Sequence, residues 1–299
     1  MTISVLIATC NRLALLRQCI HSILKNTRLP DEIIIIDQST DAVIESIHSE
    51  LESLSPVVRY HHVSWKGKTK SLNAAIAKST CEFLALTDDD VIVEEKWLET
   101  FIEKTTKYPD IDTFCGQVLP ETNSNPEGYL NLVLGDEERW INQTTNPLSP
   151  GFCGANIFIK KETLIQAGCY NILFGPGAPF RNNDDGELAY RLVKMGREIL
   201  FSPELYVHHS SWRNEKDNTE LMHNYAFGIG AFAGYYMRNS DFKPIVYLLR
   251  KLIAKIMKLV WGIIRFKQSI VLENWIHING FLSGSLCGLT PNQNIKNPN

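Results

Sequence analysis

Short apolar runs alternate with helix-period segments along the first hundred residues. Apolar runs bounded by polar residues predict buried strands at 3–8, 32–37, 57–61 and 83–91. Between them, apolar residues recur at helical spacing and predict helices at 13–25, 42–54 and 71–78. Strands that alternate with helices are typical of a doubly wound sheet with right-handed crossovers. The pattern therefore predicts an α/β fold with a mostly parallel sheet flanked by helices.

The pattern is less regular between residues 109 and 213. The stretch 151–159 runs from a small-residue turn into a strand, and further strands are expected at 113–119 and 199–207. A short helix is expected at 161–168, and it ends at a glycine, as helices often do. Turn residues cluster at 121–127 and 142–150. We assign the polar group between them, 136–140, to a surface helix.

The last third of the chain changes character. Residues 224–237 predict a packed helix, whereas 242–268 hold seven Lys or Arg and no Asp or Glu. Four of these cations project to one helical stripe: Lys251, Lys255, Lys258 and Arg265. A basic amphipathic helix is typical of peripheral binding to an anionic membrane surface. The alternative is a helix that packs on the rest of the protein with a solvated basic face.

Composition and charge exclude several classes of protein. The chain has 299 residues, 44% of them hydrophobic, and a net charge of −3, so it lacks the basic excess of a nucleic-acid-binding protein. Its seven cysteines are scattered and form no C-x-x-C pair, which indicates buried thiols in a reducing, cytoplasmic compartment. No uncharged apolar run reaches the ~18 residues that span a bilayer. The apolar run at 3–8 is short and is interpreted as a first strand rather than a signal peptide.

Three adjacent carboxylates, Asp88, Asp89 and Asp90, follow the apolar run that begins at Phe83. Ligand sites in open α/β sheets lie outside the carboxyl ends of strands, and Mg²⁺ or Mn²⁺ binds carboxylate oxygens. A divalent metal would offset the repulsion between these anions. The alternative is an acidic turn that caps the following helix, 94–108. Gly-rich phosphate loops of the G-x-G-x-x-G or G-x-x-x-x-G-K type are absent from the sequence.

Four blocks in this order resemble the family 2 glycosyltransferases: 4–12, 36–41, 67–76 and 87–90. The resemblance implies a GT-A fold, in which one α/β domain binds the nucleotide sugar and the acceptor half follows in the same chain. We therefore expect a donor-binding half at 1–108, an acceptor and catalytic half at 109–237, a C-terminal helical extension at 238–291, and a disordered tail at 292–299.

The resemblance also implies roles for individual residues. Asp90 would bind the metal on the donor diphosphate, and Asp37 would contact the nucleoside. The alternative for Asp37 is a strand-end residue that caps the following turn. The other donor-binding residues implied in this way are Thr9, Asn11, Arg12, Lys68, Asn73, Asp88 and Asp89.

The block 182–192 resembles the Glu-Asp-x-Asp-Leu segment of the family, whose middle acid is the catalytic base. Asp185 holds that place, with Asp184 and Glu187 as its supporting acids. The alternative for Asp184 and Glu187 is that they stabilise the first turn of a helix by interacting with its dipole. Gly154 and Asn156 are expected to support the acceptor side. Some GT-A enzymes add a histidine to the metal, and only one of His208 and His209 can easily point inward.

The resemblance implies a metal-dependent, inverting transfer of a sugar from a nucleotide-diphospho-sugar onto a hydroxyl group of a glycan or a lipid-linked acceptor. Within the family, uridine is the favoured base of the donor. The chain lacks the Gln-x-x-Arg-Trp signature of processive synthases, so one sugar is expected per encounter. The alternatives are an inactive nucleotide-sugar-binding protein and, with less support, a nucleotidyltransferase.

Overall fold

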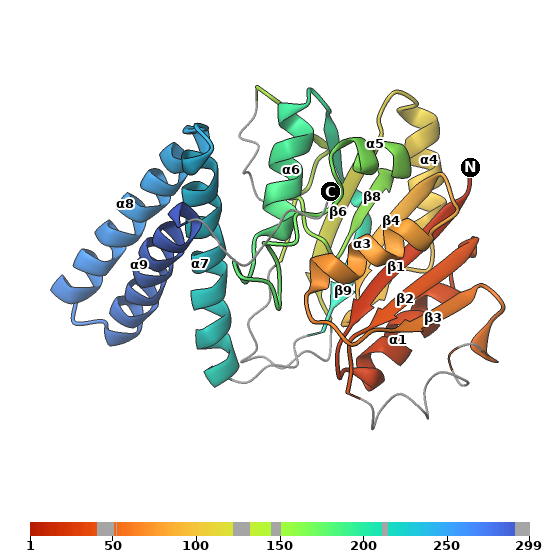
Figure 1. The fold of residues 1–299 in the computed structure, drawn as a ribbon, viewed down its shortest axis with the longest axis horizontal. Coiled ribbons are helices and arrows are strands. Elements are labelled where there is room, and N and C mark those ends of the chain that lie inside the picture. The colour runs from red at the N-terminus through yellow and green to blue at the C-terminus, as the bar shows by residue number, and fades with distance from the viewer. Residues whose placement is uncertain (41–50, 52, 122–131, 145–150, 211–214, 291–299) are drawn as a thin grey trace. The chain divides into compact units, whose positions relative to one another are not determined.

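The computed structural model describes residues 1–40, 51, 53–121, 132–144, 151–210 and 215–290 (Figure 1). The chain divides into two compact units. We call residues 1–172 with 184–213 the sheet unit, and residues 173–183 with 214–299 the helical unit. The sequence-based boundary at residue 238 differs from this division, because the preceding helix packs with the helical unit.

The N-terminal half of the sheet is parallel and doubly wound. Its strands lie in the order β3-β2-β1-β4, and their bounds are β1 (Ile3–Thr9), β2 (Glu32–Asp37), β3 (Val58–His62) and β4 (Phe83–Asp88). Helices α1 (Leu13–Leu24) and α3 (Lys68–Lys78) connect them. The register pairs Thr9 with Asp37 and Ala8 with Asp88. The carboxyl ends of three strands therefore meet at one edge of the sheet.

The second half of the sheet unit is mixed. Strand β8 runs antiparallel to both β4 and β6, and β9 pairs with β5, β6 and β7. These strands are β5 (Val91–Val93), β6 (Thr113–Pro120), β7 (Arg139–Ile141), β8 (Ile157–Lys160) and β9 (Ile199–His209). The remaining helices of the unit are α4 (Trp97–Lys107), α5 (Lys161–Gln166) and α6 (Asp184–Lys194). The structure thus confirms the predicted α/β fold.

The buried core explains why the sequences of the parallel strands are unbroken apolar runs. All four isoleucines from 33 to 36 are fully buried, as expected for parallel strands that are covered on both faces. Phe101 of α4 stacks on Phe158 of β8, with ring centroids 4.2 Å apart. Large aromatic contacts of this kind fix how α4 lies against the sheet.

One sequence-based element was wrong. Residues 139–141 form the short strand β7 on β9, not part of a surface helix. Glu138, which precedes the strand, accepts hydrogen bonds from Lys104 and Tyr108 of the α4 end. Pairing with β9 and this ionic contact outweigh the weak helical preference of a short polar segment. The helix expected at 42–54, the turn-rich stretches and the tail 292–299 lie largely or wholly outside the described residues.

The helical unit contains three long helices, α7 (Glu215–Arg238), α8 (Lys243–Ile264) and α9 (Gln268–Leu289). Its helices pack through glycines, which permit the backbones to approach closely. A Cβ atom on Gly284 of α9 would lie 2.1 Å from the carbonyl oxygen of Phe227, and one on Gly234 of α7 would lie 2.3 Å from that of Ser285. Spacing of small residues by four positions places them on one helix face. The sequence analysis did not separate α9 from the basic helix.

The segment 173–183 belongs to the helical unit although it interrupts the sheet unit in sequence. Phe174 contacts Tyr235 of α7 edge-on at 5.8 Å, and the guanidinium of Arg181 lies 4.2 Å from the Phe227 ring centroid. The segment ends at Asn183, and the next residue, Asp184, begins α6. The helical unit is therefore joined directly to the helix that carries the predicted base.

No helix among the described residues combines the length and apolarity required to cross a bilayer.

The glycine contacts predict that a Gly→Ala substitution at the helix interface destabilises the protein, the opposite of its usual effect in a helix. Gly→Ala ordinarily stabilises a helix interior by about 1 kcal/mol. At Gly284 the added methyl group would force the helices apart, so we expect Gly284→Ala to lower the free energy of unfolding by about 1–3 kcal/mol. Thermal unfolding followed by circular dichroism measures the change. Leu286→Ala, at an exposed position of the same helix, is the control and should have little effect. Stabilisation by Gly284→Ala would contradict the close packing.

Candidate active site

The site lies where the parallel strands end. Thr9 ends β1, Asp37 ends β2 and Asp88 ends β4. The strand order reverses between β1 and β4, and ligands of doubly wound sheets bind at such a switch point. The three residues predicted from separate motifs are therefore brought to one edge by the topology itself.

Asp37 is buried and already accepts several hydrogen bonds. Its Oδ2 accepts from the Tyr60 hydroxyl at 2.6 Å, and its Oδ1 accepts from the Ser39 backbone N–H at 2.8 Å. Capping of the strand-end turn is thus one function of Asp37 in this structure. A carboxylate offers about four lone-pair sites, so these contacts leave capacity for a ligand N–H. Tyr60 was not identified from the sequence, because its contact with Asp37 depends on the pairing of β2 with β3. The Ser39 contact is local to the turn after β2 and was also missed.

Asn11 and Arg12 form the turn after β1. Asn11 has a left-handed backbone (φ 57°), its N–H donates to Ser39 Oγ, and its side chain accepts from the Thr40 N–H at 3.1 Å. Asparagine tolerates this conformation better than most residues. The turn is therefore closed by its own polar contacts and aims Arg12 at the acidic cluster.

Arg12 is the fixed counter-ion of the acidic cluster. Its guanidinium lies 2.7 Å from Asp89 Oδ1 and 2.7 Å from Asp90 Oδ2. Asp89 is fully buried and also accepts a hydrogen bond from the Thr9 hydroxyl. Burial raises the pKa of Asp89 to about 7, although the charge of Arg12 opposes this shift. Asp89 is therefore held inside the cluster by Thr9 and Arg12.

Three other side chains form a group that can hold a metal ion. One ligand atom from each of Asp88, Asp90 and His209 lies within 4.8 Å of the others. His209 Nε2 is 3.4 Å from Asp90 Oδ1, since β9 pairs with β5 directly after the acidic turn. Two carboxylates and an imidazole are donors that suit Mn²⁺ or Mg²⁺. The residues present thus fit the expected metal.

His208 lies on the other face of β9. Adjacent residues of a strand point to opposite faces, and His208 contacts the Tyr206 ring with centroids 5.8 Å apart. The structure therefore brings one histidine of the pair, His209, to the acidic cluster, and His208 is not a member of the metal-capable group.

Lys68 begins α3 and connects the metal-capable group with the predicted base. Its Nζ is 2.5 Å from Asp88 Oδ1. Burial lowers the pKa of this lysine, but Asp88 and the Asp184–Asp185 pair raise that pKa well above its ordinary value. Lys68 is therefore a fixed cation beside three neighbouring carboxylates, at a position suited to an anionic ligand.

Asp185 lies in the first turn of α6 with one oxygen held and the other unsatisfied. Its Oδ2 accepts a hydrogen bond from the Gly154 N–H at 2.7 Å, whereas its buried Oδ1 has no partner among the described residues. Burial and the neighbouring Asp184 raise the pKa of Asp185 to about 7, although Lys68 opposes the shift. A Cβ atom at Gly154 would lie 2.6 Å from Oδ1, so a larger residue there would displace the Asp185 carboxylate.

Tyr170 was missed by the sequence analysis. Its hydroxyl is buried without a partner among the described residues, and Asp185 and Asp184 contribute to raising its pKa after burial. Asn73 positions this tyrosine, since its side chain accepts from the Tyr170 N–H and donates to the Tyr170 carbonyl oxygen. Asn73 thus contacts the backbone of Tyr170 in this structure, and its expected donor-binding role stays a prediction. No local sequence signal marks Tyr170.

Asn156 and Glu187, the next two predicted support residues, form contacts within the fold. The Asn156 amide is fully buried and bonds to Trp97 Nε1 and to the carbonyl oxygens of Gln117 and Leu205. Glu187 forms a two-pronged ion pair with Arg191, which in turn donates to Cys169 O. These contacts support the fold around the site, and the expected support of the acceptor side by Asn156 and Glu187 stays a prediction.

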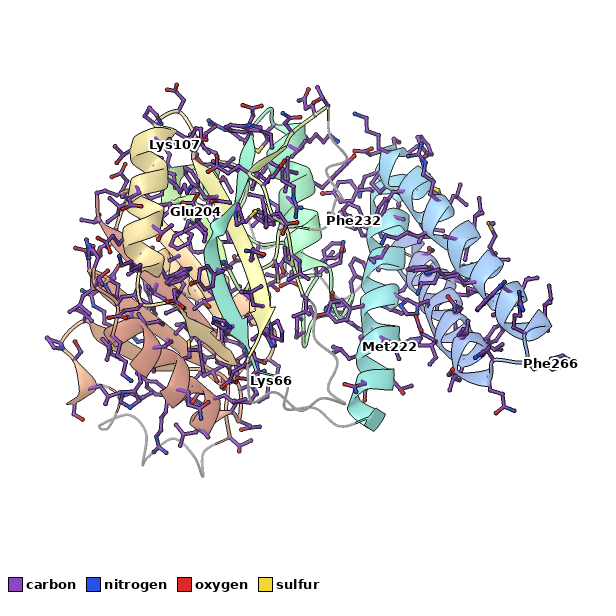
Figure 2. All side chains as sticks on the ribbon, turned by 180° about the vertical axis from the view of Figure 1, so that it is seen from behind. Lys66, Lys107, Glu204, Met222, Phe232 and Phe266 are labelled. Carbon is purple, nitrogen blue, oxygen red and sulfur yellow. The ribbon has the colours of Figure 1, made fainter. Side chains whose placement is uncertain are left out.

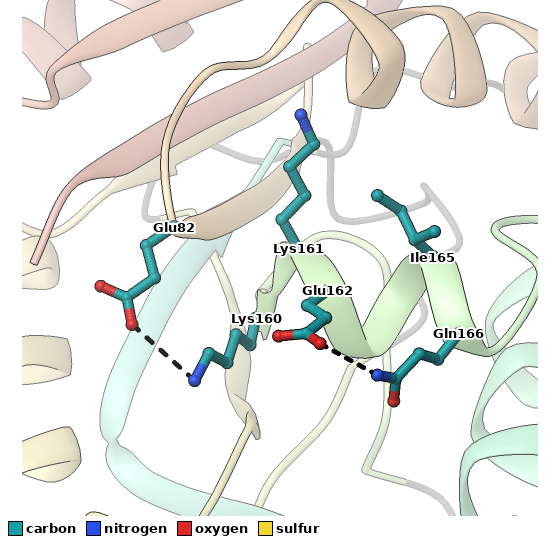
Figure 3. Close-up of a pocket in the computed structure, with 6 residues that line it drawn as sticks. All are labelled: Glu82, Lys160, Lys161, Glu162, Ile165 and Gln166. Carbon is teal, nitrogen blue, oxygen red and sulfur yellow. Dashed lines mark hydrogen bonds and ion pairs between the residues drawn. The ribbon is translucent and has the colours of Figure 1, made fainter.

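A separate hollow of about 420 Å³ lies at the opposite end of β4 (Figure 3). Its lining is Glu82, Lys160, Lys161, Glu162, Ile165 and Gln166. Lys160 pairs across the sheet with Phe83, the first residue of β4, whereas Asp88 is the last. Six strand residues span roughly 17 Å. The hollow is therefore distinct from the acidic cluster.

Comparison with solved structures supports the fold. A mannosyltransferase from Pyrobaculum calidifontis, solved with GDP-Man and Mn²⁺, has a TM-score of 0.59 at 16% identity over 95% of this chain and 73% of that one. GalNAc-T7, solved with UDP, GalNAc and Mn²⁺, has a TM-score of 0.54 at 18% identity over 72% of this chain and 44% of that one. Both similarities concern the fold.

Sequence comparison identifies the family. The chain is 22% identical over 228 residues to the glucosyl-dolichyl phosphate glucuronosyltransferase of Haloferax volcanii, covering 73% of this chain and 72% of that protein. It is 26% identical over 214 residues to the glycosyltransferase GlyG of Streptococcus pneumoniae serotype 4, covering 69% and 70%. Residues 4–167, more than half of the chain, match the sequence model of glycosyl transferase family 2. Since this match covers more than half of the chain and includes the ends of β1, β2 and β4, the chain belongs to glycosyl transferase family 2.

Proposed function

We propose that the protein transfers one sugar per encounter from a nucleotide diphosphate sugar to an acceptor hydroxyl, with a divalent metal and with inversion at the anomeric carbon. The observation that carries this proposal is the proximity of a metal-capable group to a carboxylate with an unsatisfied oxygen. Asp88 contributes to the metal-capable group and is close enough to influence the pKa of Asp185. A donor diphosphate and an acceptor hydroxyl need these two kinds of group side by side.

The donor would bind along the strand-end edge. Asp88, Asp90 and His209 would hold the metal, which when bound supplies positive charge for the departing diphosphate. Lys68 adds a fixed cation on the same side. Asp37 and the Asn11 turn would contact the nucleoside. The sequence resemblance favours uridine; one structural relative is described with UDP and another with GDP-Man.

The acceptor chemistry would depend on Asp185. Its free Oδ1 would accept the proton of the acceptor hydroxyl as that oxygen bonds to the anomeric carbon. The bond from this carbon to the diphosphate oxygen breaks on the opposite face, and the electron pair leaves with the nucleoside diphosphate. A single displacement of this kind inverts the configuration. The Gly154 N–H holds Oδ2 and keeps the carboxylate oriented.

The acceptor class is proposed as a glycan or a lipid-linked sugar. The Haloferax volcanii relative is described as acting on a glucosyl-dolichyl phosphate, which supports a lipid-linked acceptor. All seven cysteines are free, in keeping with action in the reducing cytoplasm.

The two adjacent histidines provide a matched pair of variants for the metal group. We expect His209→Ala to weaken Mn²⁺-dependent binding of UDP or GDP on the order of 10–100-fold or more, since the loss of even an outer partner that orients a metal ligand commonly costs this much. His208→Ala, one residue away on the opposite face of the strand, should leave the affinity nearly unchanged. Isothermal titration calorimetry with and without Mn²⁺ measures both. Equal effects of the two variants would contradict the assignment of His209.

Asp185→Asn should separate catalysis from donor binding. Loss of a general base typically lowers the rate on the order of 10²–10⁴-fold. The affinity for the donor should change little, because the base acts on the acceptor. With water as the acceptor, release of nucleoside diphosphate from a panel of nucleotide sugars gives the rate. The exposed Asp110→Asn is the control and should retain full activity. If Asp185→Asn keeps most of the activity, the base is another group.

The raised pKa of Asp185 predicts a pH dependence. The base works only when it is deprotonated, and a pKa near 7 means that it gains a proton as the pH falls through neutrality. We therefore expect the rate of donor hydrolysis to fall about tenfold per pH unit below this pKa. The rate should level off at higher pH. A flat profile between about pH 5 and pH 8 would contradict the assigned role.

A further inference from the structure

Helix α8 exposes a broad apolar face. Its buried positions, such as Leu248 and Gly262, lie on one side, and large apolar residues occupy another side without cover among the described residues. These exposed residues are Val246, Leu249, Ile253, Ile256, Met257, Val260, Trp261, Ile263 and Ile264. Positions three and four apart share one helix face, so they form one stripe along the helix. Phe266, at the turn between α8 and α9, is 93% exposed (Figure 2).

A basic edge runs beside this apolar face. Residues 242–268 contain seven Lys or Arg and no acid. Arg250, Lys258 and Arg265 are exposed. Lys255, which the sequence placed on the same stripe, is instead half-buried and lies 3.3 Å from Glu273 of α9. The cationic edge therefore comes from the other basic residues of the helix.

Helix α9 adds a second apolar stripe. Leu272, Trp275, Leu282 and Leu286 are each more than half exposed and recur at helical spacing. Two tryptophans, Trp261 and Trp275, are about half exposed on these helices. Tryptophan favours the boundary between water and lipid, where its ring is apolar and its N–H can find a polar partner.

We infer that the helical unit binds the surface of an anionic lipid bilayer, with α8 lying in the plane of the interface. The apolar face would enter the boundary between head groups and acyl chains, and the basic edge would contact lipid phosphates. Exposed apolar area of this extent marks an interaction site in soluble domains. Charge favours lipid over a second copy of the chain, because pairing α8 with itself would bring like-charged basic edges together.

This inference differs from binding by charge alone. A basic stripe would hold the protein by an attraction that salt removes, since the Debye length falls to about 4 Å near 0.5 M salt. Apolar insertion is not screened by salt in this way. The surface also stands independently of the transfer chemistry, because none of its residues belongs to the proposed donor or acceptor site.

Vesicle flotation tests the inference with matched variants of the full chain. The test variant is Ile253→Gln with Met257→Gln and Ile264→Gln, three exposed positions of the α8 face. The control is Leu29→Gln with Ile165→Gln and Met195→Gln, three exposed apolar positions of the sheet unit. The probe is vesicles of phosphatidylglycerol and phosphatidylcholine, with pure phosphatidylcholine as the neutral comparison. Circular dichroism establishes that both variants fold.

We expect the wild type and the control to float with anionic vesicles and to keep a substantial bound fraction at about 0.5 M salt. The test variant should bind about tenfold more weakly or worse. A blue shift of tryptophan emission on binding should accompany flotation of the wild type, because Trp261 and Trp275 would leave water.

Several results would overturn the inference. Equal flotation of the test variant and the control, or no flotation of the wild type, would exclude the α8 face as a lipid-binding surface. Complete release by salt would assign binding to the basic edge alone. A wild-type dimer in solution that the test variant converts to a monomer, without vesicle binding, would assign the face to a second copy of the chain.

Discussion

Several carboxylates lie close together at one edge of the sheet, and the site is stable only if their mutual repulsion is offset. Ligand oxygens of Asp88 and Asp90 lie within 4.8 Å of each other. Two unit charges at this distance repel by roughly 3 kcal/mol at an effective dielectric constant of about 20. Arg12 lies 2.7 Å from Asp90 and Lys68 lies 2.5 Å from Asp88, and these two cations offset part of that repulsion. A divalent metal would complete the compensation, and so the same crowding that destabilises the apo site favours ligand binding.

The same constraint links donor and acceptor chemistry. Lys68 is close to Asp88 on one side and influences Asp184 and Asp185 on the other. Asp185 keeps one oxygen free because the backbone at Gly154 holds the other. A raised pKa in this buried pair matches a base that must exchange a proton near neutral pH. Segment 173–183 belongs to the helical unit, and the next residue, Asp184, begins the helix that carries Asp185.

The parallel half of the fold was predictable because its physics is local and repetitive. Alternating periodicities identified β1, β2 and β4, and parallel pairing then required Thr9, Asp37 and Asp88 to share an edge. Which histidine faces the acids depends on the register of β9 with β5, and the choice of His209 required the structure. Asn73 was predicted as a donor-binding residue, and Asn156 and Glu187 as support for the acceptor side, because they lie in motif-bearing stretches. Their contacts with distant backbone and arginine groups have no sequence signature. The glycines of α9, by contrast, follow a four-residue spacing that could have indicated close helix packing.

The most direct test is crystallographic anomalous scattering from crystals grown with Mn²⁺ and a nucleoside diphosphate. The account predicts one manganese peak within coordination distance of Asp88, Asp90 and His209, with the diphosphate on the same ion. It also predicts that Asp185 does not ligate the metal. A nucleotide bound at the strand ends without manganese there, or manganese coordinated by Asp185, would contradict it.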